Sequence, residues 1–158
     1  MKSNVFTKKL NGKGVRVAVV RARFNEKITA GLLRGCLKGL KECGVVKKDI
    51  VVHEVPGSFE LPFTVSLLGQ VERFDVIIAL GAIIKGETKH DEYIAHAVAQ
   101  GITHASIGKE VPIIFGVITP NNFEQALVRS GNNKQNKGYE AAMAAIEMGL
   151  LVRKIRGL

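Results

Sequence analysis

The stretch FDVIIALGAIIKGETKH, residues 74–90, decides the fold. Its first seven residues are a largely apolar run rich in β-branched side chains, which predicts a strand buried on both faces. A glycine-bearing loop follows over residues 81–90, and a helix is expected over residues 91–107. A buried strand that passes through a loop into a helix is the repeating unit of α/β proteins.

The same alternation runs through the rest of the chain. Apolar runs predict further strands, and one-sided apolar patterns predict further helices. The strands are expected at residues 15–20, 50–55 and 111–119, and the helices at 26–43, 58–68, 121–129 and 138–152. Gly44 is the expected stop of the first helix, and Ser58 is the expected N-cap of the second. This order predicts a three-layer α/β/α sandwich around a parallel four-stranded sheet.

Length and composition fit one folded domain. The chain has 158 residues, of which 46% are hydrophobic and 23% charged, so wholesale disorder is excluded. No repeat or linker divides it, and we expect a single domain over residues 1–158 with an extended tail at 1–13. Its apolar runs fall short of the ~18 residues of a membrane span, and the N-terminus lacks the apolar core of a secretory signal. We therefore expect no membrane association and a cytoplasmic location.

The two cysteines, Cys36 and Cys43, fall seven residues apart on one expected helix. That spacing separates them by about 10 Å along the helix axis. The separation exceeds the ~7 Å limit between the Cα atoms of a disulfide. We expect both to be free thiols that fill the core, as suits a reducing compartment.

The chain is strongly basic, with 23 Lys and Arg against 14 Asp and Glu and a net charge of +9. This balance favours an anionic partner such as nucleic acid, a phosphorylated metabolite or an acidic surface. The basic residues are scattered, however, and they do not alternate with aromatics as in proteins that stack single-stranded bases. We expect no nucleic-acid partner, and nucleic-acid binding stays an alternative class.

Ligands of parallel α/β sheets bind beyond the carboxyl ends of the strands, so the loops there form the candidate site. The loop at residues 81–88, GAIIKGET, imitates the nucleotide P-loop, but Glu87 replaces the lysine that would reach the phosphates. This replacement argues against NTP hydrolysis. Glycines and Thr88 before a helix N-terminus still predict a site for one small phosphate, and the alternative is a plain turn.

His90 stands at the start of the helix that follows this loop. A helix N-terminus disfavours the imidazolium, so we expect a mainly neutral His90 that can accept a proton; the alternative is a helix-capping surface histidine. Asp91 and Glu92 are expected to be solvated acids that complement the helix dipole. None of the four histidines pairs with Cys or a carboxylate at metal-ligand spacing, so no metal is expected.

Two other strand ends carry candidate binding residues. Phe24 follows the first strand, where its ring could stack on a planar ligand; alternatively it covers the sheet edge. Glu60 follows the second strand near a helix start, where it could accept hydrogen bonds from ligand hydroxyls. The alternative for Glu60 is an ordinary first-turn acid.

These strand-end motifs have a family counterpart when they are taken together and in order. They are Ala22-x-Phe24-Asn25, Val55-Pro-Gly-Ser-Phe-Glu60, Leu80-Gly-Ala-Ile-Ile-Lys-Gly-Glu-Thr88-x-His90, Ile114-Phe-Gly-Val117, Arg129-x-Gly131 and Asn136-Lys-Gly138. The set resembles the 6,7-dimethyl-8-ribityllumazine synthase family over about residues 15–149. The resemblance implies a flavodoxin-like fold and a transferase of riboflavin biosynthesis. Such an enzyme condenses 5-amino-6-(D-ribitylamino)uracil with 3,4-dihydroxy-2-butanone 4-phosphate, giving 6,7-dimethyl-8-ribityllumazine, phosphate and water without a cofactor.

The resemblance also implies a role for each site residue. The uracil substrate would be bound by Phe24, Ser58, Phe59, Glu60, Ala82, Ile83, Ile84 and Phe115. The butanone phosphate would be bound by Glu87, Thr88, Arg129 and Lys137. Phe24 would stack on the uracil ring, Glu60 would bind ribityl hydroxyls, and His90 would be the catalytic proton shuttle. Phe115 and Arg129 would come from the neighbouring subunit.

A homo-oligomer is implied as well, which could be a pentamer, a double pentamer or a sixty-subunit shell, and riboflavin synthase could be a further partner. Shell-forming members often read Gly-Thr-Lys-x-Gly-Asn-Lys-Gly where residues 131–138 read GNNKQNKG. These replacements leave the size of the assembly open. Glu87 stands where many relatives have alanine, so its backbone is the part expected to act. The remaining alternative is a module that binds the uracil substrate but releases no phosphate.

Overall fold

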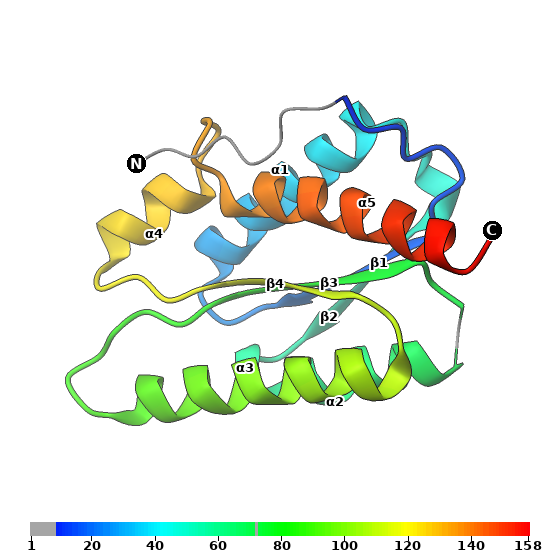
Figure 1. Ribbon diagram of the computed structural model, residues 1–158. Helices are drawn as coiled ribbons and strands as arrows, with labels where there is room; N and C mark the ends of the chain where they lie inside the picture. Colours follow the sequence, from blue (N-terminus) through cyan, green and yellow to red (C-terminus); the bar gives the residue numbers. More distant parts are fainter. Residues whose placement is uncertain (1–8, 72) are drawn as a thin grey trace.

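Four parallel strands run through the centre of the computed structural model (Figure 1). The structure describes residues 9–71 and 73–158. The strands are β1 (Val17–Ala22), β2 (Ile50–Val55), β3 (Val76–Ala82) and β4 (Ile113–Ile118). Their order in the sheet is β2-β1-β3-β4, so the direction of winding reverses between β1 and β3. The predicted parallel sheet is confirmed, and its order is that of flavodoxin-like folds.

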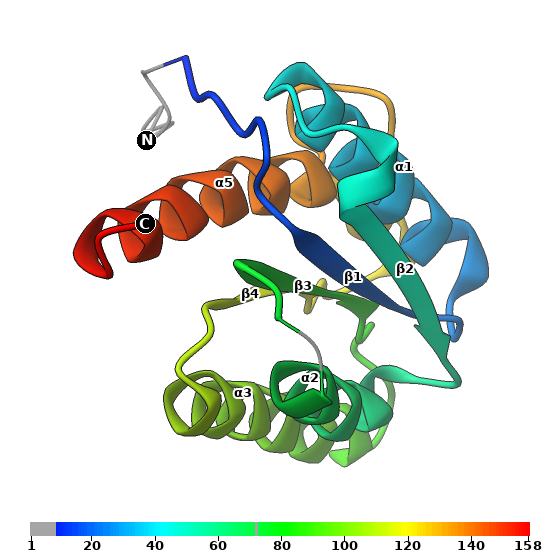
Figure 2. The same cartoon turned by 90° about the vertical axis from the view of Figure 1, so that its right-hand side faces the viewer.

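Helices cover both faces of the sheet, which confirms the three-layer prediction. They are α1 (Glu26–Glu42), α2 (Leu61–Val71), α3 (His90–Lys109), α4 (Phe123–Ser130) and α5 (Lys137–Ile155), with short 3-10 turns η1 (Lys47–Asp49) and η2 (Ser58–Glu60). α1, α4 and α5 lie on one side, and α2 and α3 lie on the other (Figures 1 and 2).

Each face of the sheet has its own core, and β1 contributes to both. Val17 and Val19 pack toward α1 and α5, whereas Ala18 and Val20 pack toward α2 and α3. All four side chains are fully buried. Burial on both faces is the reason why this strand has no polar alternation.

Cys36 and Cys43 are free thiols buried in the core beneath α1, as predicted. Burial raises the pKa of the Cys36 thiol to about 12. The thiolate is the nucleophilic form of cysteine, so burial keeps Cys36 in its weakly nucleophilic thiol form, as suits a residue that fills the core.

Several element boundaries differ from the prediction. β1 was expected at residues 15–20 and β3 at 74–80, and both end two residues later. Pairing explains the shift of β3, because Gly81 and Ala82 pair with Val117 and Ile118 of β4 and so remain in the sheet. The loop expected at residues 81–90 is therefore shorter at its start. At the other end, α3 already begins at His90.

Gly44 ends α1 with a φ of 84°, as predicted for a glycine after the last helical turn. The prediction for Ser58 is wrong, because the N-cap position is Gly57, and the Gly57 N–H donates to the Glu60 carboxylate. Ser58 is instead buried against β3, where a Cβ on Gly81 would collide with the Ser58 hydroxyl.

The tail expected at residues 1–13 falls mostly on residues 1–8, which lie outside the described residues. Residues 9–12 have neither helix nor strand, and the Gly12 N–H donates to the Cys43 carbonyl at 2.7 Å. Within the described chain, no helix combines the length and the apolarity needed to cross a membrane.

Candidate active site

A cavity of about 750 Å³ lies between the carboxyl ends of β1, β2 and β3 and the first turns of α3. This is the place where ligands of parallel sheets bind. Its lining residues are Phe24, Gly57, Ser58, Phe59, Glu60, Ala82, Ile83, Ile84, Gly86, Thr88, His90, Asp91, Tyr93, Ile94 and Ala97. Its volume lies in the range of small-molecule sites, which is roughly 300–1,000 Å³.

Phe24 lies in the turn after β1, and three contacts hold this turn. Asn25 adopts the left-handed conformation with a φ of 59°, and its side-chain amide donates to the Ala82 carbonyl at 2.9 Å. The Phe24 N–H donates to the Pro56 carbonyl, also at 2.9 Å, and the Arg23 N–H donates to the Val55 carbonyl at 2.8 Å. The Phe24 side chain is 72% exposed, so it does not cover the sheet edge. The fixed backbone presents a free aromatic face to the cavity.

The segment after β2 forms a second wall of the cavity. Oε2 of Glu60 accepts a hydrogen bond from the Gly57 N–H at 2.8 Å, so this carboxylate also supports its own turn, as the alternative interpretation held. The other oxygen, Oε1, has no hydrogen-bond partner among the described residues and is free to accept from a ligand. Behind this wall, Ser58 is buried with an exposed fraction of 8%.

The loop between β3 and α3 is anchored at both of its ends. The Ile83 N–H donates to the Ile118 carbonyl at 2.9 Å, and the Lys85 N–H donates to the Pro120 carbonyl at 3.0 Å. Toward α3, the Gly86 N–H donates to Oδ1 of Asp91 at 3.3 Å. Asp91 is half-buried, and its carboxylate supports the loop through this hydrogen bond. The sequence predicted a solvated acid at this position.

His90 is the first residue of α3, and it lines the cavity. Its N–H lies 3.4 Å from the Thr88 hydroxyl, and its imidazole has no hydrogen-bond partner among the described residues. The first N–H groups of a helix generally have no intrahelical partner, and a helix N-terminus therefore favours an anion. The exposed imidazole of His90 thus lies at the N-terminus of a helix.

Tyr93, Ile94 and Ala97 line the cavity from α3, and none of them was predicted from the sequence. Their spacing of three, four and seven residues from His90 was the available signal, because such positions share one helix face. Tyr93 and Phe59 are 68% and 62% exposed. Together with Phe24 they give the cavity an aromatic mouth, which suits a planar ring.

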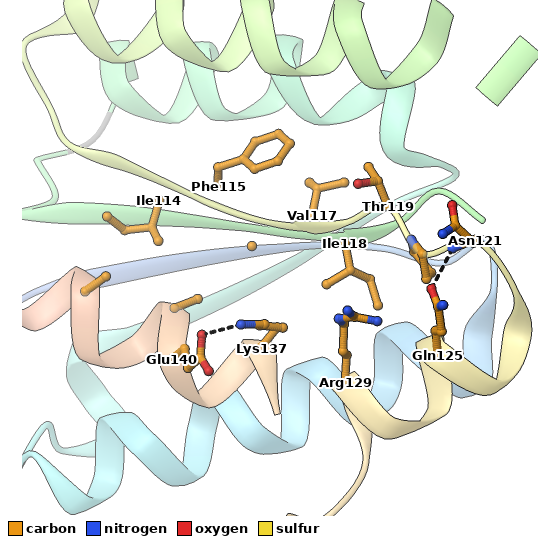
Figure 3. Close-up of a pocket in the computed structure, with 14 residues that line it drawn as sticks. Ile114, Phe115, Val117, Ile118, Thr119, Asn121, Gln125, Arg129, Lys137 and Glu140 are labelled. Atoms are coloured by element: carbon orange, nitrogen blue, oxygen red, sulfur yellow. Dashed lines mark hydrogen bonds and ion pairs between the residues drawn. The ribbon is translucent and has the colours of Figure 1, made fainter. Parts of the chain in front are cut away.

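A second cavity, of about 550 Å³, is bounded by β4, α4 and α5 (Figure 3). Arg129 from the end of α4 and Lys137 from the start of α5 line it, and Nζ of Lys137 pairs with Oε2 of Glu140 at 2.7 Å. Phe115 extends from the other side of β4, toward α3, and is 45% exposed (Figure 3). Arg129 has no ion pair within the described part of the chain, so its charge is available to an anion.

The two cavities share no lining residue. Nine of the expected site residues line the first cavity, namely Phe24, Ser58, Phe59, Glu60, Ala82, Ile83, Ile84, Thr88 and His90. Three line the second, namely Phe115, Arg129 and Lys137. Glu87 lines neither cavity, and its side chain is exposed. One chain therefore does not bring the two groups together.

Residues 9–71 and 73–158 contain no group of three or more His, Cys, Asp or Glu side chains that could hold a metal ion.

A family model described as 6,7-dimethyl-8-ribityllumazine synthase matches residues 14–153. The matched segment contains all four strands and every lining residue of both cavities.

Proposed function

The chain belongs to the 6,7-dimethyl-8-ribityllumazine synthase family, whose members are transferases of riboflavin biosynthesis, and we propose on this premise that its substrates are 5-amino-6-(D-ribitylamino)uracil and 3,4-dihydroxy-2-butanone 4-phosphate. The observation that carries the proposal is the first cavity. It combines a free aromatic face, a carboxylate with a free oxygen and a histidine at the N-terminus of a helix. A planar uracil, its ribityl hydroxyls and a phosphate ester require these three kinds of group.

The uracil substrate occupies the part of the cavity between the strand ends. The Phe24 ring stacks on the uracil, and Oε1 of Glu60 accepts hydrogen bonds from the ribityl chain. The exposure of Phe24 and the free Glu60 oxygen support this orientation. Phe59 closes the same side, while Ser58 supports the wall from behind. The backbone groups of residues 82–84 face the edge of the ring.

The butanone phosphate lies at the α3 end of the cavity. Its phosphate receives hydrogen bonds from the backbone at Glu87 and from the Thr88 hydroxyl, next to the N–H groups of the first turn of α3. Arg129, which has no ion pair among the described residues, and Lys137 supply positive charge to this phosphate. These cations lie in the second cavity, so they reach the phosphate from another subunit.

A neighbouring copy of the chain completes the site. The aromatic and histidine side of the site lies in one cavity and the cationic side in another, and no residue is common to both. Two such different surfaces meet in a head-to-tail contact, which closes into a ring. We infer that each pocket combines Phe24, Glu60 and His90 of one subunit with Phe115 and Arg129 of the next. A pentamer is the expected ring.

Chemistry in this pocket needs positioning and proton transfer. The free amine of the uracil condenses with the ketone to form an imine and release water. His90 then accepts a proton from the sugar-derived carbon chain, phosphate leaves, and ring closure with loss of a second water gives the lumazine. Holding the two reactants together can supply about 7–11 kcal/mol of the barrier reduction.

Incubation with both substrates tests the proposal. The expected result is the lumazine chromophore together with one equivalent of free phosphate, and omission of either substrate serves as the control. Binding of the ribitylamino uracil without phosphate release would instead identify a non-catalytic binding module.

A further inference from the structure

A buried arginine lies at the end of β1 that leads to the site. Arg21 is 5% exposed, and no other charged residue in the described part of the chain is buried. Its side chain lies on the face of the sheet that α1 covers, since Val17 and Val19 of the same strand face that way. Burying a guanidinium costs free energy unless carboxylates pair with it. Packing alone therefore does not explain why an arginine occupies this position.

Two carboxylates neutralise this cation from two different elements. Nη2 of Arg21 donates to Oε1 of Glu54 on β2 at 2.6 Å, and Nη1 donates to Oε1 of Glu26 in the first turn of α1 at 3.1 Å. Arg21 and Glu54 are direct partners in the register of the two strands. Nε of Arg21 is buried without a hydrogen-bond partner among the described residues. The guanidinium is thus held entirely by these two acids.

Both acids adjoin the walls of the first cavity. Glu54 comes two residues before Pro56, whose carbonyl accepts the Phe24 N–H. Glu26 comes two residues after Phe24, on the other side of the left-handed Asn25. The pairs Arg21–Glu54 and Arg21–Glu26 therefore tie together the strand before the Phe24 turn, the helix after it and the strand beside it.

Stability alone does not call for a guanidinium at this position, because the side chains of Glu26 and Glu54 are 67% and 44% exposed and exposed ion pairs contribute only about 0–1 kcal/mol. A guanidinium differs from an apolar side chain in being directional: its planar fork fixes the angle and distance of each carboxylate. Directionality matters where a turn must be held in one place, as for an aromatic ring that stacks on a ligand.

We propose that Arg21, Glu26 and Glu54 form a clamp that holds the turn carrying Phe24 in the position needed to stack on the uracil ring. Arg21 is a positioning residue in this clamp and acts on the substrate only through Phe24. The kinetic part of the inference rests on the proposed function, and the structural part does not.

The test replaces Arg21 by methionine, which keeps much of the length of the side chain and removes its fork. KM for the ribitylamino uracil should rise several-fold, up to about tenfold, because a displaced Phe24 ring loses part of its stacking contact with the uracil. KM for the butanone phosphate should stay within about twofold, since the clamp does not touch that end. Arg34→Met on the solvent side of α1 is the matched control and should change neither KM.

Two further variants separate positioning from general destabilisation. In a Phe24→Ala background, Arg21→Met should raise KM for the ribitylamino uracil no further. The effects of two substitutions are not additive when one residue acts through the other. The triple variant Arg21→Met, Glu26→Gln, Glu54→Gln removes every charge of the clamp. It should regain the thermal midpoint of the parent and keep the raised KM. Arg21→Lys should also keep the raised KM, because its point charge cannot hold two carboxylates.

Amide hydrogen exchange gives a readout without substrate. The Phe24 and Arg23 amides, which donate to Pro56 and Val55, should exchange at least tenfold faster in Arg21→Met than in the parent. Faster exchange in a protein that forms no lumazine would support the clamp and overturn the proposed function. Unchanged exchange, an equal rise of both KM values or an additive effect with Phe24→Ala would overturn the clamp.

Discussion

At the scale of single residues, His90 combines an exposed imidazole with a position at the N-terminus of α3. Imidazole is the side chain that most readily accepts and returns a proton near neutral pH. The residue is exposed, and its imidazole has no hydrogen-bond partner among the described residues. Substitution of His90 should therefore affect chemistry and leave folding unchanged.

His90→Ala should lower kcat by about 10²–10⁴-fold, the usual contribution of a general base, without abolishing turnover. Both KM values should change little, because the imidazole mainly serves the chemical steps. Steady-state kinetics with each substrate varied in turn is the measurement, and His104→Ala, also exposed on α3, is the control. Loss of binding together with turnover in a folded His90→Ala protein contradicts this division of roles.

Glu60 has one oxygen on the Gly57 N–H and one that is free, so its substitution by glutamine tests the free one. The introduced amide keeps an acceptor for Gly57 but loses the negative charge, and charged acceptors form hydrogen bonds about twice as strong as neutral ones. Glu60→Gln should raise KM for the ribitylamino uracil several-fold and leave that for the butanone phosphate nearly unchanged. Equal weakening for both substrates would contradict the assignment of Glu60 to the ribityl end of the pocket.

At the scale of elements, α1 and α5 approach each other closely because small residues line their contact. A Cβ on Gly138 would collide with the backbone carbonyl of Leu32, and a Cβ on Gly35 would collide with the side chain of Asn136. Asn136 is buried, donates to the carbonyls of Gly31 and Gly131, and caps α5 by accepting from the Tyr139 N–H at 3.0 Å. This contact fixes the start of α5, and with it Lys137.

Gly138→Ala should lower the free energy of unfolding by about 1–3 kcal/mol, because the obstacle is backbone that cannot turn aside. Gly108→Ala is the matched control, since a Cβ there meets nothing within 4 Å and its helical position gains about 0.5–1 kcal/mol from alanine. Chemical denaturation of both variants and the parent measures the difference. A Gly138→Ala protein as stable as the parent would mean that α5 can shift freely on α1.

At the scale of the whole molecule, the two cavities lie at different places on one chain, and the proposed pocket needs both. Arg129 can then serve only the pocket of a neighbour. Defects on the two sides should complement each other when different subunits share a ring.

One subunit should carry Glu60→Ala with His90→Ala, and the other should carry Arg129→Ala. In rings assembled at random from equal amounts, about a quarter of the pockets are intact, because each of the two required subunits is present with a probability of about one half. Co-expressed and co-purified rings should regain about that share of the parent activity. Activity equal to the sum of the two defective parents would place the whole site in one chain.

Much of this protein follows from local sequence. The apolar runs around Val17–Ala22 and Val76–Ala82 specify strands buried on both faces, and their alternation with helices specifies a parallel sheet. The carboxyl ends of such strands are the binding edge, which predicted Phe24, Glu60 and His90 as site residues. The predicted ends of these two strands differ by two residues from the observed ones, because pairing with the neighbouring strands decides them and local propensity does not.

Tertiary structure alone decided which residues meet. Tyr93 and Asp91 line the first cavity because α3 lies against the strand ends, and Arg129 falls in a different cavity because α4 packs on the opposite face. The sequence gives no signal that Arg21 is paired; the register of β1 on β2 places Glu54 beside it, and the start of α1 places Glu26 there. The spacing of apolar residues along the chain shows whether a segment is a helix or a strand. Which elements touch depends on how their side chains pack together, and local spacing does not contain that information.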